Sequence, residues 1–221
     1  MTARATKPQH GSGAAARTKP PRRTLTWKKD PAGRRERVLA EAARLFSERG
    51  YASVSTRDVA SAAGVAEGSV FQYFGSKAEL LRAVGERYGR GFAAAMFDGM
   101  EAVASRATVE NMVARAFDYV ARSWPGFGLF LLSDDPSAAP LAQRANRIAI
   151  TSAVERMLEL WSSERLIGEV DAPVVAELLF GLVEASLRAC FTGADAPSRQ
   201  RFERQTASAI VRILGVPDRA S

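Results

Sequence analysis

The segment STRDVASAAGVAEGSVFQYF, residues 55–74, carries the strongest structural signal in the chain. Ser55 and Asp58 have the spacing of a capping box, in which each side chain accepts a hydrogen bond from the other residue's backbone N–H. A short helix is predicted to follow, with Val59, Ala60 and Ala63 facing inward. Gly64 ends this helix, and a second short helix runs from about Ala66 to Phe74. Such a pair is typical of a helix-turn-helix, although capped helices joined by glycine also occur in plain helical bundles.

Helical patterns continue on both sides of this segment. Apolar residues recur at helical spacing between Ala32 and Arg49, at Val38, Leu39, Ala42, Ala43, Leu45 and Phe46. Downstream, Ser76 and Glu79 form a second capping pattern. It opens a longer helix whose apolar residues include Leu80, Leu81 and Val84.

Over residues 34–82 the chain resembles the TetR-type (tetracycline-repressor-like) transcriptional regulators. The matching residues are RVLAEAARLF (37–46), Gly50-Tyr51, STRDVA (55–60), AGVAEGSVFQYF (63–74) and Lys77. The resemblance implies an all-α fold of about nine or ten helices in total. A three-helix helix-turn-helix DNA-binding domain would span residues 31–80, and a helical ligand-binding and dimerisation domain would span residues 81–221.

The resemblance makes the helix at 66–74 the recognition helix, which lies in the major groove of DNA. The DNA-binding residues expected from it are Arg57, Gly68, Ser69, Phe71, Gln72, Tyr73 and Lys77. Gln72 would bond an adenine edge, and Lys77 would hold a phosphate. The competing interpretation is that Gln72 and Ser69 are merely solvated and that Arg57 pairs with Asp58 or Glu67.

Two residues depart from the family pattern. Phe71 stands where the family often has tyrosine, so a hydroxyl that would meet a phosphate is missing. Glu67 stands where a basic or polar residue is common, and its carboxylate repels phosphate, although it could accept from a cytosine amino group. Residues 31–80 hold seven basic and six acidic side chains, a net of +1, which is low for a DNA-binding domain.

The formal net charge of +7 lies entirely in residues 1–30, which hold eight basic side chains and one acidic one. With three prolines and few apolar residues, this segment is predicted to be a disordered basic tail. Two interpretations remain open, an arm that follows DNA phosphates or enters a minor groove, and a solubilising tail without specific contacts. Arg22-Arg23 resembles an export signal, but the apolar stretch that should follow is replaced by Trp27-Lys28-Lys29-Asp30-Pro31.

Residues after about Gly91 are predicted to be helical throughout. Thr108 would cap a helix to Arg122, Trp124-Pro125-Gly126 would break it, and residues 127–131 would form a short apolar segment. Further helices are expected from Ser137 to Trp161, after Asp171-Ala172-Pro173 and after Asp195-Ala196-Pro197. The apolar positions of the helix ending at Trp161 are Leu141, Ala145, Ile148, Ala149, Val154, Met157, Leu158 and Trp161.

The helix beginning near Pro173 is apolar on nearly all sides, more than a small core requires, which favours an oligomer interface. The resemblance implies a homodimer through helices at about 140–161 and 173–191, and hence a roughly palindromic operator. Large apolar side chains are also expected to line a pocket for a small apolar or amphipathic effector, as an alternative to ordinary core packing. They are Phe97, Met100, Met112, Phe117, Trp124, Phe127, Phe130, Met157, Trp161 and Phe180.

Gly85, Gly89 and Gly91 lie along or just after the helix that joins the two domains, and each lowers helix stability relative to alanine. Either they let that helix swing when an effector binds, or they allow close packing or end the helix. Under the first interpretation Gly85→Ala blunts induction.

Composition excludes several classes of function. The one histidine, His10, lies in the tail, and the one cysteine, Cys190, cannot form an internal disulfide. We therefore expect no catalytic site, no metal site and no cofactor, and Cys190 as a buried thiol. No apolar run reaches the length of a transmembrane helix, and we expect a cytoplasmic protein. The sequence thus predicts a dimeric repressor that a ligand releases from double-stranded DNA, with a constitutive or architectural DNA-binding dimer as the alternative.

The low charge of residues 31–80 generates a prediction about the tail. If the tail supplies the missing phosphate contacts, deleting residues 1–29 weakens DNA binding and flattens its salt dependence, because fewer counterions are released. The measurement is the slope of log affinity against log salt for the full-length and truncated chains. An unchanged slope would assign the tail no role on DNA.

Overall fold

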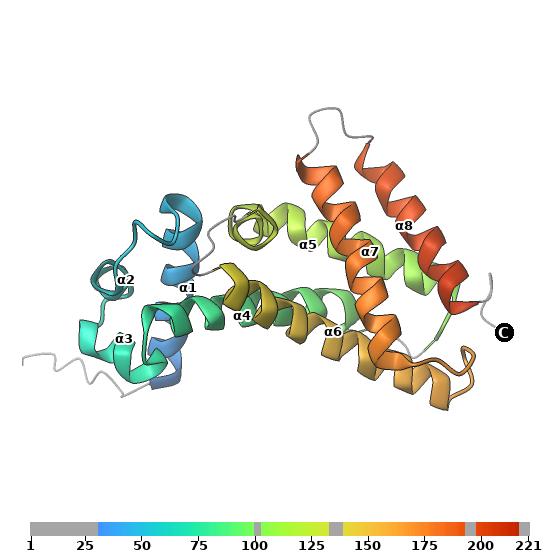
Figure 1. Cartoon of the computed structure of the whole chain (residues 1–221), viewed down its shortest axis with the longest axis horizontal. Helices are drawn as coiled ribbons and strands as arrows, with labels where there is room; N and C mark the ends of the chain where they lie inside the picture. The colour runs from blue at the N-terminus through green and yellow to red at the C-terminus, as the bar shows by residue number, and fades with distance from the viewer. Residues whose placement is uncertain (1–30, 100–102, 133–138, 193–197, 217–221) are drawn as a thin grey trace, which may run out of the picture. The chain divides into compact units, whose positions relative to one another are not determined.

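The computed structural model describes residues 31–99, 103–132, 139–192 and 198–216, with side chains except at 124–132 and 139. These residues belong to one compact unit spanning residues 31–221. Within the described ranges they form eight helices and no strand (Figure 1). The helices are α1 (Pro31–Arg49), α2 (Thr56–Ala63), α3 (Glu67–Phe74), α4 (Lys77–Phe97), α5 (Arg106–Leu132), α6 (Ala139–Ser163), α7 (Ala172–Thr192) and α8 (Arg199–Leu214). The all-α prediction is confirmed, with a helix count close to the expected one.

The helix-turn-helix forms where the capping residues predict it. The Ser55 Oγ accepts the Asp58 N–H at 3.1 Å, and the Asp58 carboxylate accepts the Ser55 N–H at 2.8 Å. These two hydrogen bonds satisfy donors that the first turn of α2 would otherwise leave unpaired. Gly64 ends α2 at φ 65°, in the left-handed region that favours glycine. At the start of α4 the Ser76 Oγ accepts the Glu79 N–H at 3.1 Å.

A first hydrophobic cluster holds α1, α2, α3 and the beginning of α4 together. Its fully buried side chains include Val38 and Phe46 of α1, Val59 of α2, and Val70 of α3. The residues predicted to face inward are therefore buried, and Val65 packs against the cluster while remaining half-buried. Ala142, at the beginning of α6, belongs to the same cluster.

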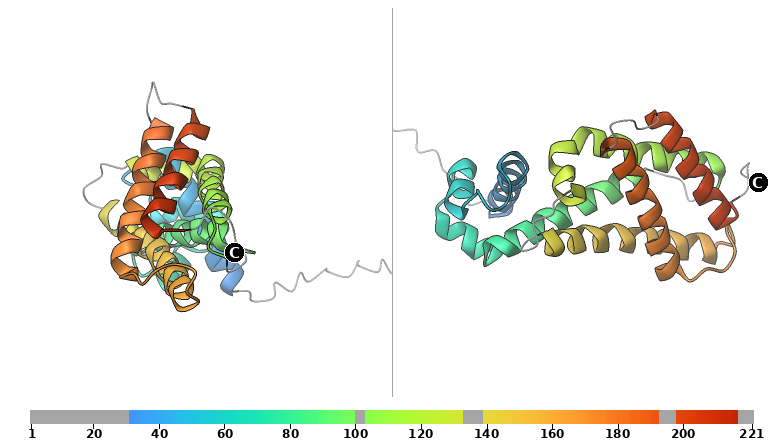
Figure 2. Two further views of the ribbon diagram at one scale, coloured as in Figure 1. Left: turned by 90° about the vertical axis from the view of Figure 1, so that its right-hand side faces the viewer. Right: turned by 45° about the horizontal axis from the view of Figure 1, so that its top comes forward.

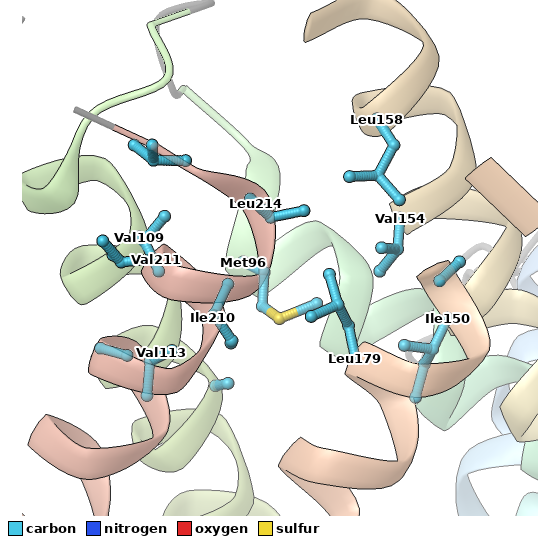
Figure 3. Packing of buried hydrophobic residues seen from close by; sticks show 14 of the residues in the cluster. Met96, Val109, Val113, Ile150, Val154, Leu158, Leu179, Ile210, Val211 and Leu214 are labelled. Carbon is cyan, nitrogen blue, oxygen red and sulfur yellow. The ribbon is translucent and has the colours of Figure 1, made fainter. Parts of the chain in front are cut away.

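A second hydrophobic cluster fills the space between the end of α4 and helices α5 to α8. Figure 3 shows Met96 and Leu179 between residues of α5 and α8, such as Val113 and Ile210, and residues of α6, such as Val154. Helices α7 and α8 lie side by side and antiparallel (Figures 1 and 2). Four helices and the end of a fifth thus enclose one apolar interior.

Helices α4 and α6 run side by side and approach each other closely at two glycines (Figure 1). A Cβ atom built on Gly85 would lie 2.2 Å from the Ala142 carbonyl oxygen. A Cβ atom on Gly89 would lie 2.5 Å from the Asn146 carbonyl oxygen. Both obstructions are backbone atoms, which cannot move aside as a side chain can. The structure thus supports the close-packing interpretation of these two glycines.

The predicted helix break at Trp124-Pro125-Gly126 is wrong, because α5 continues to Leu132. A proline inside a helix removes one hydrogen bond and bends the axis without necessarily ending the helix. Figure 1 shows the last turns of α5 running in another direction from its beginning. The short segment predicted at 127–131 is part of α5, so the residues that the structure describes form fewer helices than predicted.

The predicted cap at Thr108 is also wrong. Helix α5 begins at Arg106, and the Ser105 Oγ accepts the Thr108 N–H at 3.1 Å. The start of α7 is as predicted, with the Asp171 carboxylate accepting the Val174 N–H at 3.3 Å. Ser137 and Asp195-Ala196-Pro197 lie outside the described residues.

The buried face of α6 differs from the predicted one in its first half. Leu141 and Ile148 are exposed, whereas Ala142 and Asn146 are buried. The reason is the close approach to α4, which only small side chains on α6 permit. Beyond Ile150 the buried residues are Thr151 and the predicted apolar ones, Val154, Leu158 and Trp161, with Met157 half-buried.

The α4–α6 contact generates a stability prediction. Gly85→Ala should lower the free energy of unfolding by about 1–3 kcal/mol, because the added methyl group meets the Ala142 backbone. The matched control is Gly68→Ala in α3, where a Cβ atom meets nothing within 4 Å. That substitution should raise stability by about 0.5–1 kcal/mol through helix propensity alone. Chemical denaturation measures both, and equal effects of the two substitutions would contradict the close-packing account.

Candidate functional site

The outward face of α3 is the first candidate site. Val70 and Phe74 are buried and attach α3 to the first cluster, whereas Gly68 and Gln72 are exposed. Phe71 is 47% exposed, a high value for a large apolar side chain. Ser69 and Tyr73 are half-buried beside them. A short rigid helix therefore presents a flat set of mostly uncharged groups to solvent.

Glu67 connects α3 to α2 rather than facing solvent alone. Its carboxylate accepts a hydrogen bond from the Thr56 hydroxyl at 2.9 Å and one from the Arg57 Nε at 3.3 Å. The Arg57 side chain remains 83% exposed, so this ion pair leaves most of the guanidinium accessible. The pairing of Arg57 with Glu67, expected as an alternative to DNA contact, is present, and it also removes part of the negative charge from the face of α3.

Asp58 contacts Ser55 and not Arg57. The hydrogen bonds from the Ser55 hydroxyl and backbone N–H lower the pKa of the Asp58 carboxyl below its ordinary value. The carboxylate is therefore charged at neutral pH and holds the start of α2. This stabilising contribution is present above the ordinary pKa of an aspartate and is lost as the pH falls through the lowered one.

Lys77 and the first turn of α4 lie next to α3 in the chain. The Lys77 Nζ lies 4.1 Å from the centre of the Tyr51 ring, a cation–π contact that holds this half-buried side chain in place. Ser76 caps the same helix, and Gly75 precedes it at φ 77°. The first N–H groups of α4 and the Lys77 ammonium are the groups that are expected from the sequence to hold a phosphate.

The structure adds a basic residue that the sequence analysis did not select. The Arg35 guanidinium lies 4.8 Å from the centre of the Phe74 ring, so the beginning of α1 brings positive charge to the end of α3. The arginines at 34, 35 and 37 were the available signal in the sequence. Arg44, in contrast, is engaged by Glu41 and Glu48 on its own helix.

The second candidate site is a largely apolar cavity of about 430 Å³ among α4, α5, α6, α7 and α8. Five of the predicted ligand-binding residues line it, namely Phe97, Met112, Met157, Trp161 and Phe180. Phe117 does not line it; its side chain is fully buried in the core, where the centre of its ring lies 6.4 Å from the centre of the Phe191 ring. Met100 and the side chains of Trp124, Phe127 and Phe130 lie outside the described residues.

The polar groups of the cavity were missed by the sequence analysis. They are Gln143, Arg144, Asn146, Arg147, Glu184 and Arg188. Asn146 was overlooked because the apolar pattern placed the buried face of α6 one residue away. Arg147 and Glu177 form an ion pair between α6 and α7.

Cys190 is half-buried and packs against the second cluster. Burial raises the pKa of its thiol, which lowers its thiolate content and its reactivity at neutral pH.

Across the described helices, none combines the length and the apolar character that crossing a membrane requires.

Comparison with known proteins bears on the first site. Residues 38–84 match the model of bacterial regulatory proteins of the tetR family. The HTH-type transcriptional repressor KstR2 of Rhodococcus jostii (strain RHA1) is 32% identical over 103 residues, which are 44% of this chain and 48% of that protein. The chain therefore spans about half of the length of this curated relative.

Solved structures extend the comparison to the fold. A putative TetR-family regulator from Syntrophomonas wolfei superposes with a TM-score of 0.66 at 15% identity, covering 83% of this chain and 95% of that one. The regulator FadR from Bacillus subtilis, solved in complex with stearoyl-CoA, gives a TM-score of 0.62 at 18% identity, covering 80% and 97%. At these identities the superpositions establish the fold alone. The chain thus contains a segment of the tetR family at residues 38–84, and its described helices share the fold of these solved regulators.

Proposed function

We propose that the chain is a dimeric, sequence-specific DNA-binding repressor that leaves a palindromic operator when a small apolar or amphipathic ligand enters the cavity. The observation that carries the proposal is the outward face of α3. Its buried side chains anchor it to α1, α2 and α4, while Gly68, Phe71 and Gln72 project from that scaffold. A rigid helix with an exposed readable face is what insertion into a major groove requires.

Each exposed group has a role that follows from its chemistry. The Gln72 amide suits the donor and acceptor pair of an adenine edge, and the Phe71 ring suits the methyl group of thymine. Gly68 lets the backbone approach the DNA. Arg57, Lys77 and the N–H groups at the start of α4 provide phosphate contacts that fix the position of α3 in the groove.

Dimerisation is supported by the exposed apolar face of α7. Leu178 is 61% exposed, Val174 is also exposed, and Gly181 on the same face has open space around it. Leu141 and Ile148 extend the exposed apolar surface onto α6. Covering such surface with a second copy by a two-fold axis removes it from water and repeats the α3 face, so the operator becomes palindromic.

Release from DNA requires a connection between the cavity and the first cluster. Helix α6 provides one, because Ala142 packs in the first cluster while Asn146, Ile150 and Trp161 line the cavity. Arg87 of α4 also forms an ion pair with Glu36 of α1 at 2.7 Å. A ligand that shifts α6 therefore shifts the support of α3, and it favours whichever state it binds more tightly.

A constitutive DNA-binding dimer without an effector is the second candidate. The cavity favours the ligand-responsive proposal, because its volume falls within the range of ligand sites and its lining combines apolar walls with a few polar groups. Titrating a ligand against the protein–DNA complex separates the two, since only the first candidate loses DNA.

Direct readout by α3 generates a prediction with an internal control. Gln72→Ala should weaken binding to a selected operator about tenfold or more and relax the preference at one base pair, because a bidentate contact is lost. Gln205→Ala, at an exposed position of α8, is the matched control and should leave affinity unchanged. Fluorescence anisotropy at fixed salt measures both. Equal affinities for the two variants would remove Gln72 from the base-reading residues.

The proposed interface generates a prediction about assembly. Leu178→Glu on α7 and Ile148→Glu on α6 should shift the protein from dimer to monomer, because a carboxylate would be buried without a partner. Both side chains are exposed in one protomer, so each protomer should fold. Ala62→Glu, on the exposed side of α2, is the control and should stay dimeric. Analytical ultracentrifugation measures the oligomeric state of each variant. A Leu178→Glu protein that stays dimeric would exclude this face of α7 from the dimer interface.

A further inference from the structure

We infer that the effector is an elongated anionic amphiphile, with a long apolar chain that follows α6 toward Trp161 and an anionic head group at Arg144 and Arg188. The inference rests on the proposed function of the cavity as an effector site. It adds the chemical class of the ligand and the direction in which the ligand lies. Three observations carry it, namely the length of the cavity, the distribution of its polar groups and a buried amide without a partner.

The cavity is long for its volume. Its lining on α6 extends from Pro140 to Trp161, which is about 30 Å along the axis of a helix that rises 1.5 Å per residue. A round chamber of about 430 Å³ would be far shorter than this. The shape thus suits an extended chain better than a compact or multi-ring ligand.

Polar and apolar lining residues separate along this length. Toward the end of α6 the lining consists of Val154, Met157 and Trp161, with Leu214 of α8, and all of these are apolar. Every polar lining residue comes from 143–147 of α6 or from 184–188 of α7. A ligand that matches this surface is apolar at one end and polar at the other.

The polar end carries a net positive charge. Three arginines and one glutamate line it. Arg147 is paired with Glu177, and Arg188 lies 3.5 Å from Glu184, whereas Arg144 has no acidic partner among the residues that the structure describes. An anionic head group would supply that partner, and the half-exposed setting of these arginines admits a hydrated head from solvent.

Asn146 supplies the third observation. The residue is only 6% exposed, it lines the cavity, and its Oδ1 is buried without a hydrogen-bond partner. A buried acceptor left unpaired is costly, so a donor brought by the ligand would relieve that cost. A hydroxyl or amide N–H close to the head group fits. Both a β-hydroxy acid and an acyl thioester of coenzyme A contain the anionic head, the donor and the chain.

The test measures ligand binding by quenching of Trp161 fluorescence with chain-brominated probes, with Trp161→Phe protein as the blank. Hexadecanoate should bind about tenfold more tightly than hexadecan-1-ol, because only the acid forms a charge-assisted contact. Octanoate should bind more weakly than hexadecanoate, because a shorter chain leaves the apolar end unfilled. Comparing the affinities of β-hydroxyhexadecanoate and hexadecanoyl-coenzyme A shows whether a hydroxyl or an amide N–H is the donor to Asn146.

Two variants locate the head group. Arg144→Gln should reduce the preference for the acid over the alcohol to near unity, whereas Arg204→Gln, an exposed arginine of α8 away from the cavity, should leave it unchanged. Asn146→Ala should abolish the advantage of the β-hydroxy acid, because it removes the amide acceptor while keeping the side chain small where α6 meets α4. A drop in melting temperature with the advantage retained would show that Asn146 acts only in packing.

DNA release is measured separately on the same ligands, so that the two proposals fail in different ways. Equal binding of the acid and the alcohol, or Arg144→Gln protein that still prefers the acid, would overturn the anionic class. If a compact neutral ligand released the DNA and hexadecanoate did not bind, the proposed ligand class would be wrong, but the cavity would still be an effector site. Hexadecanoate that binds as expected and leaves the DNA bound would support the class and contradict the effector function.

Discussion

The close approach of α4 and α6 at Gly85 and Gly89 is the constraint on which the other parts of the structure depend. Helix α4 begins in the first cluster, at Leu80, and ends in the second, at Met96. Helix α6 likewise contributes to both clusters. Because the two backbones touch where side chains are absent, neither helix can move far along the other without losing that fit. The two clusters are thereby held in one unit.

Asn146 belongs both to the contact between α4 and α6 and to the lining of the cavity. Its carbonyl oxygen faces Gly89 in the contact between the helices, and its side chain lines the cavity. In the proposed function, a ligand that meets the Asn146 amide acts on the same turn of α6 that fits against α4. The connection from the cavity to α3 then needs no loop or tail. It passes through the packed helices α6 and α4 into the first cluster.

The sequence predicted the helix-turn-helix well because its signals are local. The capping pair at Ser55 and Asp58 and the stop at Gly64 act within a few residues, and the structure shows all three. The buried face of α6 could not be predicted in the same way. It depends on glycines more than fifty residues earlier in the chain, whose contact favours small residues over large apolar ones. Asn146 and the polar end of the cavity were missed for that reason, and Arg35 because its contact with Phe74 joins distant segments.

The central claim is that α3 of each protomer reads DNA as part of a two-fold dimer. The most direct test is selective enrichment of random duplex DNA by the full-length protein, followed by sequencing. The account predicts an enriched palindromic site, with half-sites about one helical turn or more apart. Salt-sensitive binding without any enriched sequence would contradict it, because DNA contact would then come from positive charge alone.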